Sequence, residues 1–156
     1  QITIINDDAK NVINLFGDDY FDVITCNPPY FDTNNSLFEN VNSIKAIARH
    51  EKLLNLDDIF TISKRVLKTN GRLAMVHRTE RLTQILDTAN KYGFMAKKIR
   101  FIYPKENRDS DLMLIEFVKG GKKGLKMLYP LIVYDNDGNY NVEIKNMFGD
   151  DTHDTK

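Results

Sequence analysis

The residues best suited to do chemistry are Asn27, Pro28, Pro29 and Tyr30, in the stretch "DVITCNPPYF". They stand where a strand-like apolar run ends. Each proline fixes its own φ and restricts the preceding residue toward extended backbone, and neither carries an N–H. The stretch therefore offers oxygen acceptors on a stiff backbone, an arrangement that suits a substrate rich in N–H donors.

An exocyclic amino group on a planar base is such a substrate, because its lone pair is delocalised and weakly nucleophilic. The side-chain oxygen of Asn27 and the carbonyl oxygen of Pro28 would accept its two N–H bonds. They would thereby localise the lone pair and stabilise the positive charge that grows on nitrogen. Tyr30 would stack on the flipped-out base, worth about 1–3 kcal/mol, and Phe31 would extend that wall. These roles predict methyl transfer to the amino group; a rigid turn that only ends a strand is the structural alternative.

The elements that would position this stretch alternate between strands and helices, which predicts an α/β domain with a mostly parallel sheet. Tyr20 to Cys26 is typical of a strand buried on both faces. We expect Asn70-Gly71 to end one helix, and Thr79 and Gly93 to cap and close the next. In chain order, the patterns predict strand 2–5, helix 12–16, strand 20–26, helix 43–54, helix 59–67, strand 72–77, helix 79–93, and strands 94–103 and 111–118.

The end of the sheet is distinctive. The last two strands are joined only by the short loop "PKENRDS", which cannot make a parallel crossover, so they must pair antiparallel. The tail "LIVYDNDGNYNVEI" (131–144) predicts a further hairpin that turns at Asp137-Gly138.

The stretch "DVITCNPPYF" resembles motif IV of the class I S-adenosylmethionine-dependent amino-methyltransferases. In addition, "IARHE" (47–51), "VHRTERL" (76–82) and the tail from Leu125 to Tyr134 resemble the Firmicutes branch of the tRNA(Val) adenine-N6-methyltransferase family. The resemblance covers essentially the whole chain. It implies the C-terminal half of a Rossmann-like methyltransferase sheet with an antiparallel final strand, an S-adenosyl-L-methionine cofactor, tRNA as substrate, and Asn27 to Tyr30 as the catalytic loop.

By the same resemblance, Asp8 matches the acidic residue that binds the adenine amino group of the cofactor, and Asn27 would contact the cofactor too. A strand-ending turn or helix cap is the plain alternative for Asp8. The glycine-rich turn of the family has no counterpart here. Because the chain opens inside a strand-like run, "QITIINDD", we interpret it as part of a longer protein, with a processed mature start as the alternative. We expect this part alone to be inactive.

Basic side chains are predicted at the substrate-facing end of the sheet. Arg49 and His50 follow the catalytic loop, and His77, Arg78 and Arg81 lie at the end of the next strand. These residues could hold RNA phosphates, which position the RNA without reading its sequence. A solvated face with ion pairs to neighbouring glutamates is the alternative for each of them.

Bulk properties narrow the class of protein. The chain has 156 residues, net charge zero and a single cysteine, Cys26. These values fit one domain, give no global attraction to nucleic acid, and exclude an intrachain disulfide framework. No apolar run approaches the length of a membrane helix and the histidines lack ligand-spaced companions, so no membrane and no metal is predicted. We expect a cytoplasmic protein.

The sequence therefore predicts a partial Rossmann-like methyltransferase domain at 1–120 and a C-terminal extension at 121–156, packed on that domain and disordered at its last residues. The predicted function is methyl transfer to the exocyclic amino group of adenine in RNA. The alternatives are a protein glutamine N5-methyltransferase, which has the same acceptor geometry, a DNA adenine enzyme, and a non-catalytic RNA-binding module.

Overall fold

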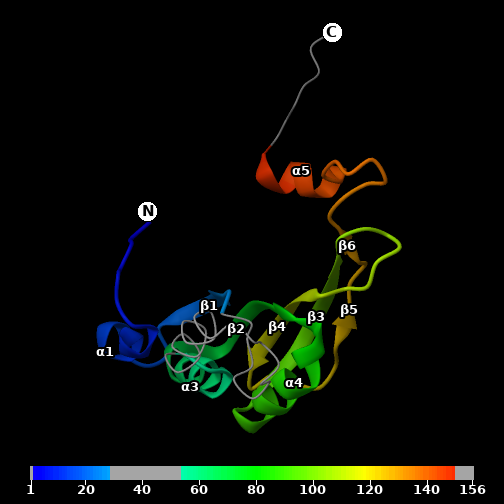
Figure 1. The fold of residues 1–156 in the computed structure, drawn as a ribbon. Coiled ribbons are helices and arrows are strands. Elements are labelled where there is room, and N and C mark those ends of the chain that lie inside the picture. The colour runs from blue at the N-terminus through cyan, green and yellow to red at the C-terminus, as the bar shows by residue number, and fades with distance from the viewer. Residues whose placement is uncertain (1, 29–53, 150–156) are drawn as a thin grey trace, which may run out of the picture.

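The computed structural model describes residues 2–28 and 54–149. In Figure 1 they form a twisted sheet with helices against it and a C-terminal extension that projects beyond one end. The helices are α1 (Val12–Phe16), α3 (Leu56–Val66), α4 (Leu82–Lys91) and α5 (Val142–Phe148), with single 3-10 turns η1 (Ala9–Asn11) and η2 (Thr79–Arg81). The strands are β1 (Phe21–Cys26), β2 (Leu67–Arg78), β3 (Phe94–Tyr103), β4 (Leu112–Lys119), β5 (Lys126–Met127) and β6 (Leu131–Ile132).

The order of strands across the sheet is β1-β2-β4-β3-β5, and β6 also pairs with β3. Only β4 runs against its neighbours, so β1, β2, β3, β5 and β6 all point the same way. The predicted fold class, a mostly parallel α/β sheet in which the final long strand is antiparallel, is confirmed. The short loop 104–111 returns the chain beside β3, and β4 fills the gap that the α4 crossover leaves between β2 and β3.

Helices α3 and α4 cover one face of the sheet and build the core. Asn55 caps α3 in a capping box, since its side-chain oxygen accepts from the Asp58 N–H at 2.8 Å while the Asp58 carboxylate accepts from the Asn55 N–H at 3.1 Å. The fully buried aromatic core side chains, from α3, β3 and β4, are Phe60, Phe94 and Phe117. The ring of Phe94 lies 5.5 Å from that of Phe60 in a tilted contact, and the ring of Phe117 lies 5.4 Å from it in an edge-to-face contact.

Four local predictions are wrong. Strand β1 is not buried on both faces, since Val23 is 41% exposed. Residues 2–5 form no strand, and Ile2 is 92% exposed, because a strand needs a neighbour to satisfy its backbone and cover its side chains. Asn70 does adopt a left-handed conformation, with φ 63°, but α3 already ends at Val66 and Asn70 lies in an irregular part of β2. Thr79 caps no helix; its hydroxyl donates to the Ser110 carbonyl at 2.6 Å.

The C-terminal hairpin is confirmed only at its turn. Tyr134 and Tyr140 form a single antiparallel bridge, and the Asp135 N–H donates to the Asn139 carbonyl at 2.9 Å. The returning arm then continues as helix α5 instead of a strand. In this helix Ile144 is buried and Glu143 reaches an arginine of β3, contacts that outweigh the weak local preference for a strand.

Candidate functional site

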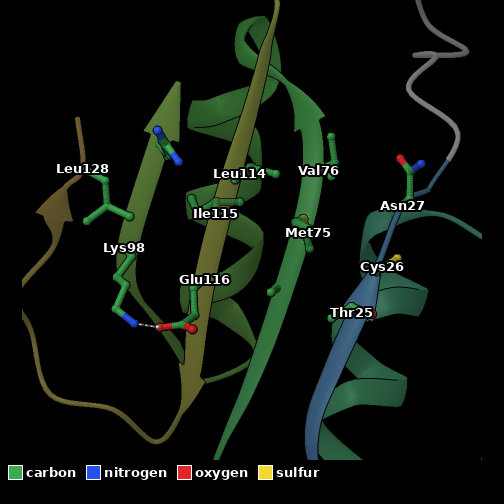
Figure 2. A pocket seen from close by; sticks show the side chains of 12 residues that line it. Thr25, Cys26, Asn27, Met75, Val76, Lys98, Leu114, Ile115, Glu116 and Leu128 are labelled. Atoms are coloured by element: carbon green, nitrogen blue, oxygen red, sulfur yellow. Dashed lines mark ion pairs between the residues drawn. The ribbon is translucent and has the colours of Figure 1, made fainter. Parts of the chain in front are cut away.

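Asn27 stands at the carboxyl end of β1, directly after Cys26, and its side chain is exposed. It lines the rim of a cavity of about 500 Å³ on the sheet face opposite α3 and α4. Figure 2 shows Asn27 above Cys26 and Thr25, across from Met75 and Val76 of β2. Asn27 is therefore exposed at the end of a strand, where ligands of open α/β sheets bind.

The cavity itself is mainly apolar. Burial raises the pKa of the Cys26 thiol, so this side chain is uncharged near neutral pH. The charged residues of the cavity lie on the far strands, where Glu116 is paired with Lys98 at 3.0 Å. Within the described residues, the part of the cavity wall beside Asn27 therefore carries no charged side chain, and the side chains of Asn27 and Thr25 are polar.

Pro28 turns the other way and is buried. It lines a small pocket together with His77 and Arg81 from the end of β2 and with residues around the start of α3, which are Leu54, Asn55, Leu56 and Ile59. The proline that follows the exposed amide is therefore held against the core. This support fixes the direction in which the backbone leaves β1.

His77 is only 1% exposed. Its Nδ1 accepts a hydrogen bond of 2.8 Å from the Arg78 N–H, so in the neutral ring the proton resides on Nε2. Burial first, and then the nearby charge of Arg81, lowers the pKa of His77 to about 4. We expected His77 on the RNA-facing surface with Arg78 and Arg81; the structure instead places it behind Pro28 as a neutral supporting group.

Arg78 and Arg81 lie at the carboxyl end of β2, as predicted, and both are half-buried. Arg81 Nε donates to the Gln84 side-chain oxygen at 2.9 Å. The Thr79 N–H donates to the Asp111 carbonyl at 3.0 Å, which ties this corner to loop 104–111. The arginines and the loop therefore share the end of the sheet that carries Asn27, while their contact with RNA stays a prediction.

Asp8 lies in the turn before η1. Its carboxylate accepts from the Lys10 N–H at 2.9 Å, so it acts as the cap of that short turn. This is the plain alternative for the residue, and its proposed contact with a cofactor stays untested. The remaining candidates, Pro29, Tyr30, Phe31, Arg49 and His50, and the expected helix 43–54 except its last residue, lie outside the described residues.

Sequence reasoning missed Arg100, which lies in the middle of β3 and is 16% exposed at its side chain. Its guanidinium binds both carboxylate oxygens of Glu143 in α5, at 2.6 and 2.7 Å, and donates to the carbonyls of Tyr129 and Pro130 at 2.8 and 3.3 Å. Arg100 thus clamps the C-terminal extension onto the sheet. An arginine inside the apolar run "FMAKKIRFIY" was the signal that could have indicated a buried partner.

The described residues contain neither a metal-binding cluster nor a helix that could span a membrane. Among residues 2–28 and 54–149, no three His, Cys, Asp or Glu side chains are grouped to hold a metal ion. None of the helices in the same residues has the length and apolar character needed to cross a membrane.

Curated relatives are methyltransferases at low identity, while no family model matches the chain. The chain is 29% identical over 96 residues to the tRNA1(Val) (adenine(37)-N6)-methyltransferase of Aliivibrio salmonicida, which covers 62% of this chain and 40% of the relative. It is 24% identical over 140 residues to the enzyme of the same name from Aeromonas hydrophila, covering 90% and 56%. The chain thus spans about half the length of these relatives.

Solved structures share the fold. A predicted O-methyltransferase from Agrobacterium tumefaciens superposes with a TM-score of 0.66 at 18% identity, over 89% of this chain and 56% of that one. M1.HpyAVI, solved as its complex with SAM, superposes with a TM-score of 0.52 at 19% identity, over 88% and 68%. The chain therefore has part of a Rossmann-like methyltransferase fold, and the names of its relatives support a methyltransferase.

Proposed function

We propose that this chain is the methyl-acceptor half of an S-adenosylmethionine-dependent methyltransferase that modifies the exocyclic amino group of adenine in RNA, with tRNA as the substrate class. The observation that carries the proposal is the position of Asn27, exposed at the carboxyl end of β1 while Pro28 is buried against the core. The names of the relatives at 24–29% identity support the same reaction.

In the proposed mechanism, the side-chain oxygen of Asn27 and the carbonyl oxygen of Pro28 accept the two N–H bonds of the target nitrogen. Their fixed dipoles favour tetrahedral nitrogen and stabilise its developing positive charge. S-adenosylmethionine, when bound, supplies the electrophilic methyl group. The nitrogen forms the new N–C bond as the methyl–sulfur bond breaks, and one amine proton then leaves to water.

The residues described here fit the acceptor side of such a reaction. Within the described residues, the cavity wall beside Asn27 from β1 and β2 carries no charged side chain; the buried His77 in the pocket of Pro28 is uncharged near neutral pH, and Arg81 lines that same pocket. Fixed dipoles act more strongly on a developing charge where less water screens them, as at the buried Pro28. On the cofactor side, Asp8 is the residue of this chain that we propose to receive the cofactor, through its carboxylate.

The test is transfer of a labelled methyl group by the complete protein that contains this chain. We expect label in tRNA, and N6-methyladenosine after digestion of the product to nucleosides. Release-factor protein and duplex DNA are the competing substrates. Label in a glutamine amide or in DNA, with none in tRNA, would overturn the proposed substrate, and no transfer to any of them would overturn the proposed reaction.

A further inference from the structure

The outer edge of the sheet beyond β3 carries a row of cations, which are exposed except for the half-buried Lys97. The loop after β4 and strand β5 contribute Lys122, Lys123 and Lys126, and β3 contributes Lys97. The main chain of this row is ordered by the sheet, because β5 pairs with β3 at Lys98 and Ile99. We call Lys97, Lys122, Lys123 and Lys126, together with the neighbouring Tyr129, the lysine edge.

The lysines of this edge differ from others in the protein by their lack of acidic partners. Five other lysines each pair with a carboxylate at 2.7–3.0 Å: Lys10, Lys68, Lys91, Lys98 and Lys119. Within the described residues, the four lysines of the edge have no carboxylate partner, and Lys97 donates instead to the Lys122 carbonyl at 3.2 Å. A chain of zero net charge thus gathers uncompensated positive charge at one edge.

Tyr129 adds an aromatic face at the upper end of the row. Its side chain is 81% exposed, although its backbone is fixed, because its carbonyl accepts from Arg100 Nε at 2.8 Å. A large aromatic ring that stands in solvent on a fixed backbone is suited to stacking on a flat partner. Lysines and a fixed ring side by side match the two surfaces of RNA, its phosphates and its bases.

We infer that the lysine edge binds RNA, with Lys122, Lys123 and Lys126 on the phosphates and Tyr129 stacked on an unpaired base. The choice of RNA rests on the proposed function. The edge runs along β3 toward the end of the sheet that carries Asn27, since β3 and β1 point the same way. Four strand spacings of about 4.8 Å separate β5 from β1, so RNA bound at the lysine edge would be held well away from its target base.

This separation makes the inference specific. The edge should strengthen the binding of a folded RNA that reaches both places, and it should not affect a short oligonucleotide that fills only the catalytic end. An edge that serves only to keep β5 from pairing with another chain, a common use of lysine on outer strands, would affect neither.

The experiment compares two triple variants of the complete protein that remove the same charge. One is Lys122→Gln/Lys123→Gln/Lys126→Gln, and the control is Lys10→Gln/Lys64→Gln/Lys68→Gln, in elements at the other edge of the sheet. We expect the edge variant to bind tRNA roughly tenfold more weakly. The slope of log K against log[salt] should become less steep by about two to three, because each phosphate contact contributes about 0.7–0.9 to it. The control variant should keep both values.

Further arms locate the contact. Tyr129→Ala should weaken tRNA binding about fivefold without changing the salt slope, because stacking releases no counterions. A five-nucleotide RNA should bind wild type and edge variant alike. Equal affinity and slope for wild type and edge variant on tRNA would overturn the inference, and so would equal losses in the two triple variants.

Failure of this inference and failure of the proposed function are distinguishable. Binding is measured without cofactor and without turnover. The predicted loss of tRNA binding in the edge variant can therefore be observed even if the protein methylates no RNA. If the complete protein methylates no RNA but the edge variant still loses tRNA affinity and slope, the edge stands and the proposed reaction falls. If methylation of tRNA is normal and the edge variant binds as wild type, the reaction stands and the edge falls.

Discussion

The two edges of the sheet are built on opposite principles. At β1, Asn27 is exposed, whereas the residue after it, Pro28, is buried and lines a small pocket together with the buried, neutral His77 and with Arg81. At β5, the lysines are exposed and unpaired among the described residues, and their support is the backbone alone. Under the proposed function, the group that meets the reacting atom has a rigid support from the core, whereas the groups that hold the RNA have charge and access to solvent.

The largest expected effect comes from removing the exposed amide of the β1 edge. Asn27→Ala should lower kcat by about 10²–10³-fold, the usual cost of losing one fixed dipole that stabilises developing charge. The Kd for tRNA should change little, because the β5 edge is intact. Single-turnover methylation and filter binding on the complete protein measure the two quantities.

Asn27→Asp is the informative companion variant, since it keeps the acceptor oxygen and the size of the side chain. Wild-type thermal stability in both variants would show that the fold is unchanged. A rate within threefold of wild type for Asn27→Ala would remove Asn27 from the chemistry. A loss in tRNA affinity as large as the loss in rate would mean that Asn27 acts in binding and not only in the chemistry, which would contradict the division of roles between the two edges.

A smaller effect is expected from the clamp that joins the β5 edge to the sheet. Arg100→Met should lower the free energy of unfolding by about 2–4 kcal/mol, because the carboxylate of Glu143 and two carbonyls lose a largely buried charged partner. Urea unfolding measures this change, and weaker tRNA binding should accompany it as Tyr129 loses its fixed position.

Glu143→Gln is the matched control for the clamp. It removes the charge of the exposed partner but leaves the two backbone carbonyls bound to Arg100, so it should cost less than half as much. Equal costs for the two variants would mean that the ion pair with α5 alone holds the extension.

The sequence could predict those features that depend on local pattern and short connections. Strand 94–103 was predicted with its observed bounds, and the short loop 104–111 required β4 to return antiparallel. The place of Asn27 followed from a polar motif after an apolar strand. These predictions rest on the pattern of apolar residues along each strand and on the length of the connecting loop, and both are visible in a short stretch of sequence.

Other features depend on partners distant in sequence and could not be read locally. The insertion of β4 between β2 and β3 and the helical form of residues 142–148 are set by tertiary contacts, including that of Glu143 with Arg100. The burial of His77 was in principle readable. Leu73 and Met75 face the core, so the residue two further along the same strand must face it as well.

The smallest effect is a pH dependence of stability, which tests whether His77, in the pocket of Pro28, is neutral in the folded protein. The pKa of His77 is about 4 in the folded protein, against about 6.5 when unfolded, so below pH 6.5 the unfolded chain takes up a proton that the folded chain refuses. This contribution to stability is complete above about pH 6.5 and is lost as the pH falls toward 4. Between pH 8 and pH 5 it amounts to about 2 kcal/mol, at 1.36 kcal/mol per pKa unit.

Urea unfolding of wild type and His77→Gln at both pH values measures it. The variant loses stability at both, but the pH-dependent part should vanish, while Asp18 and Asp57, whose carboxyl pKa values are lowered by their partners, stay ionised in both proteins at pH 5. An unchanged pH dependence in His77→Gln would mean that His77 can be protonated in the folded state. It would contradict a neutral histidine in the pocket of Pro28.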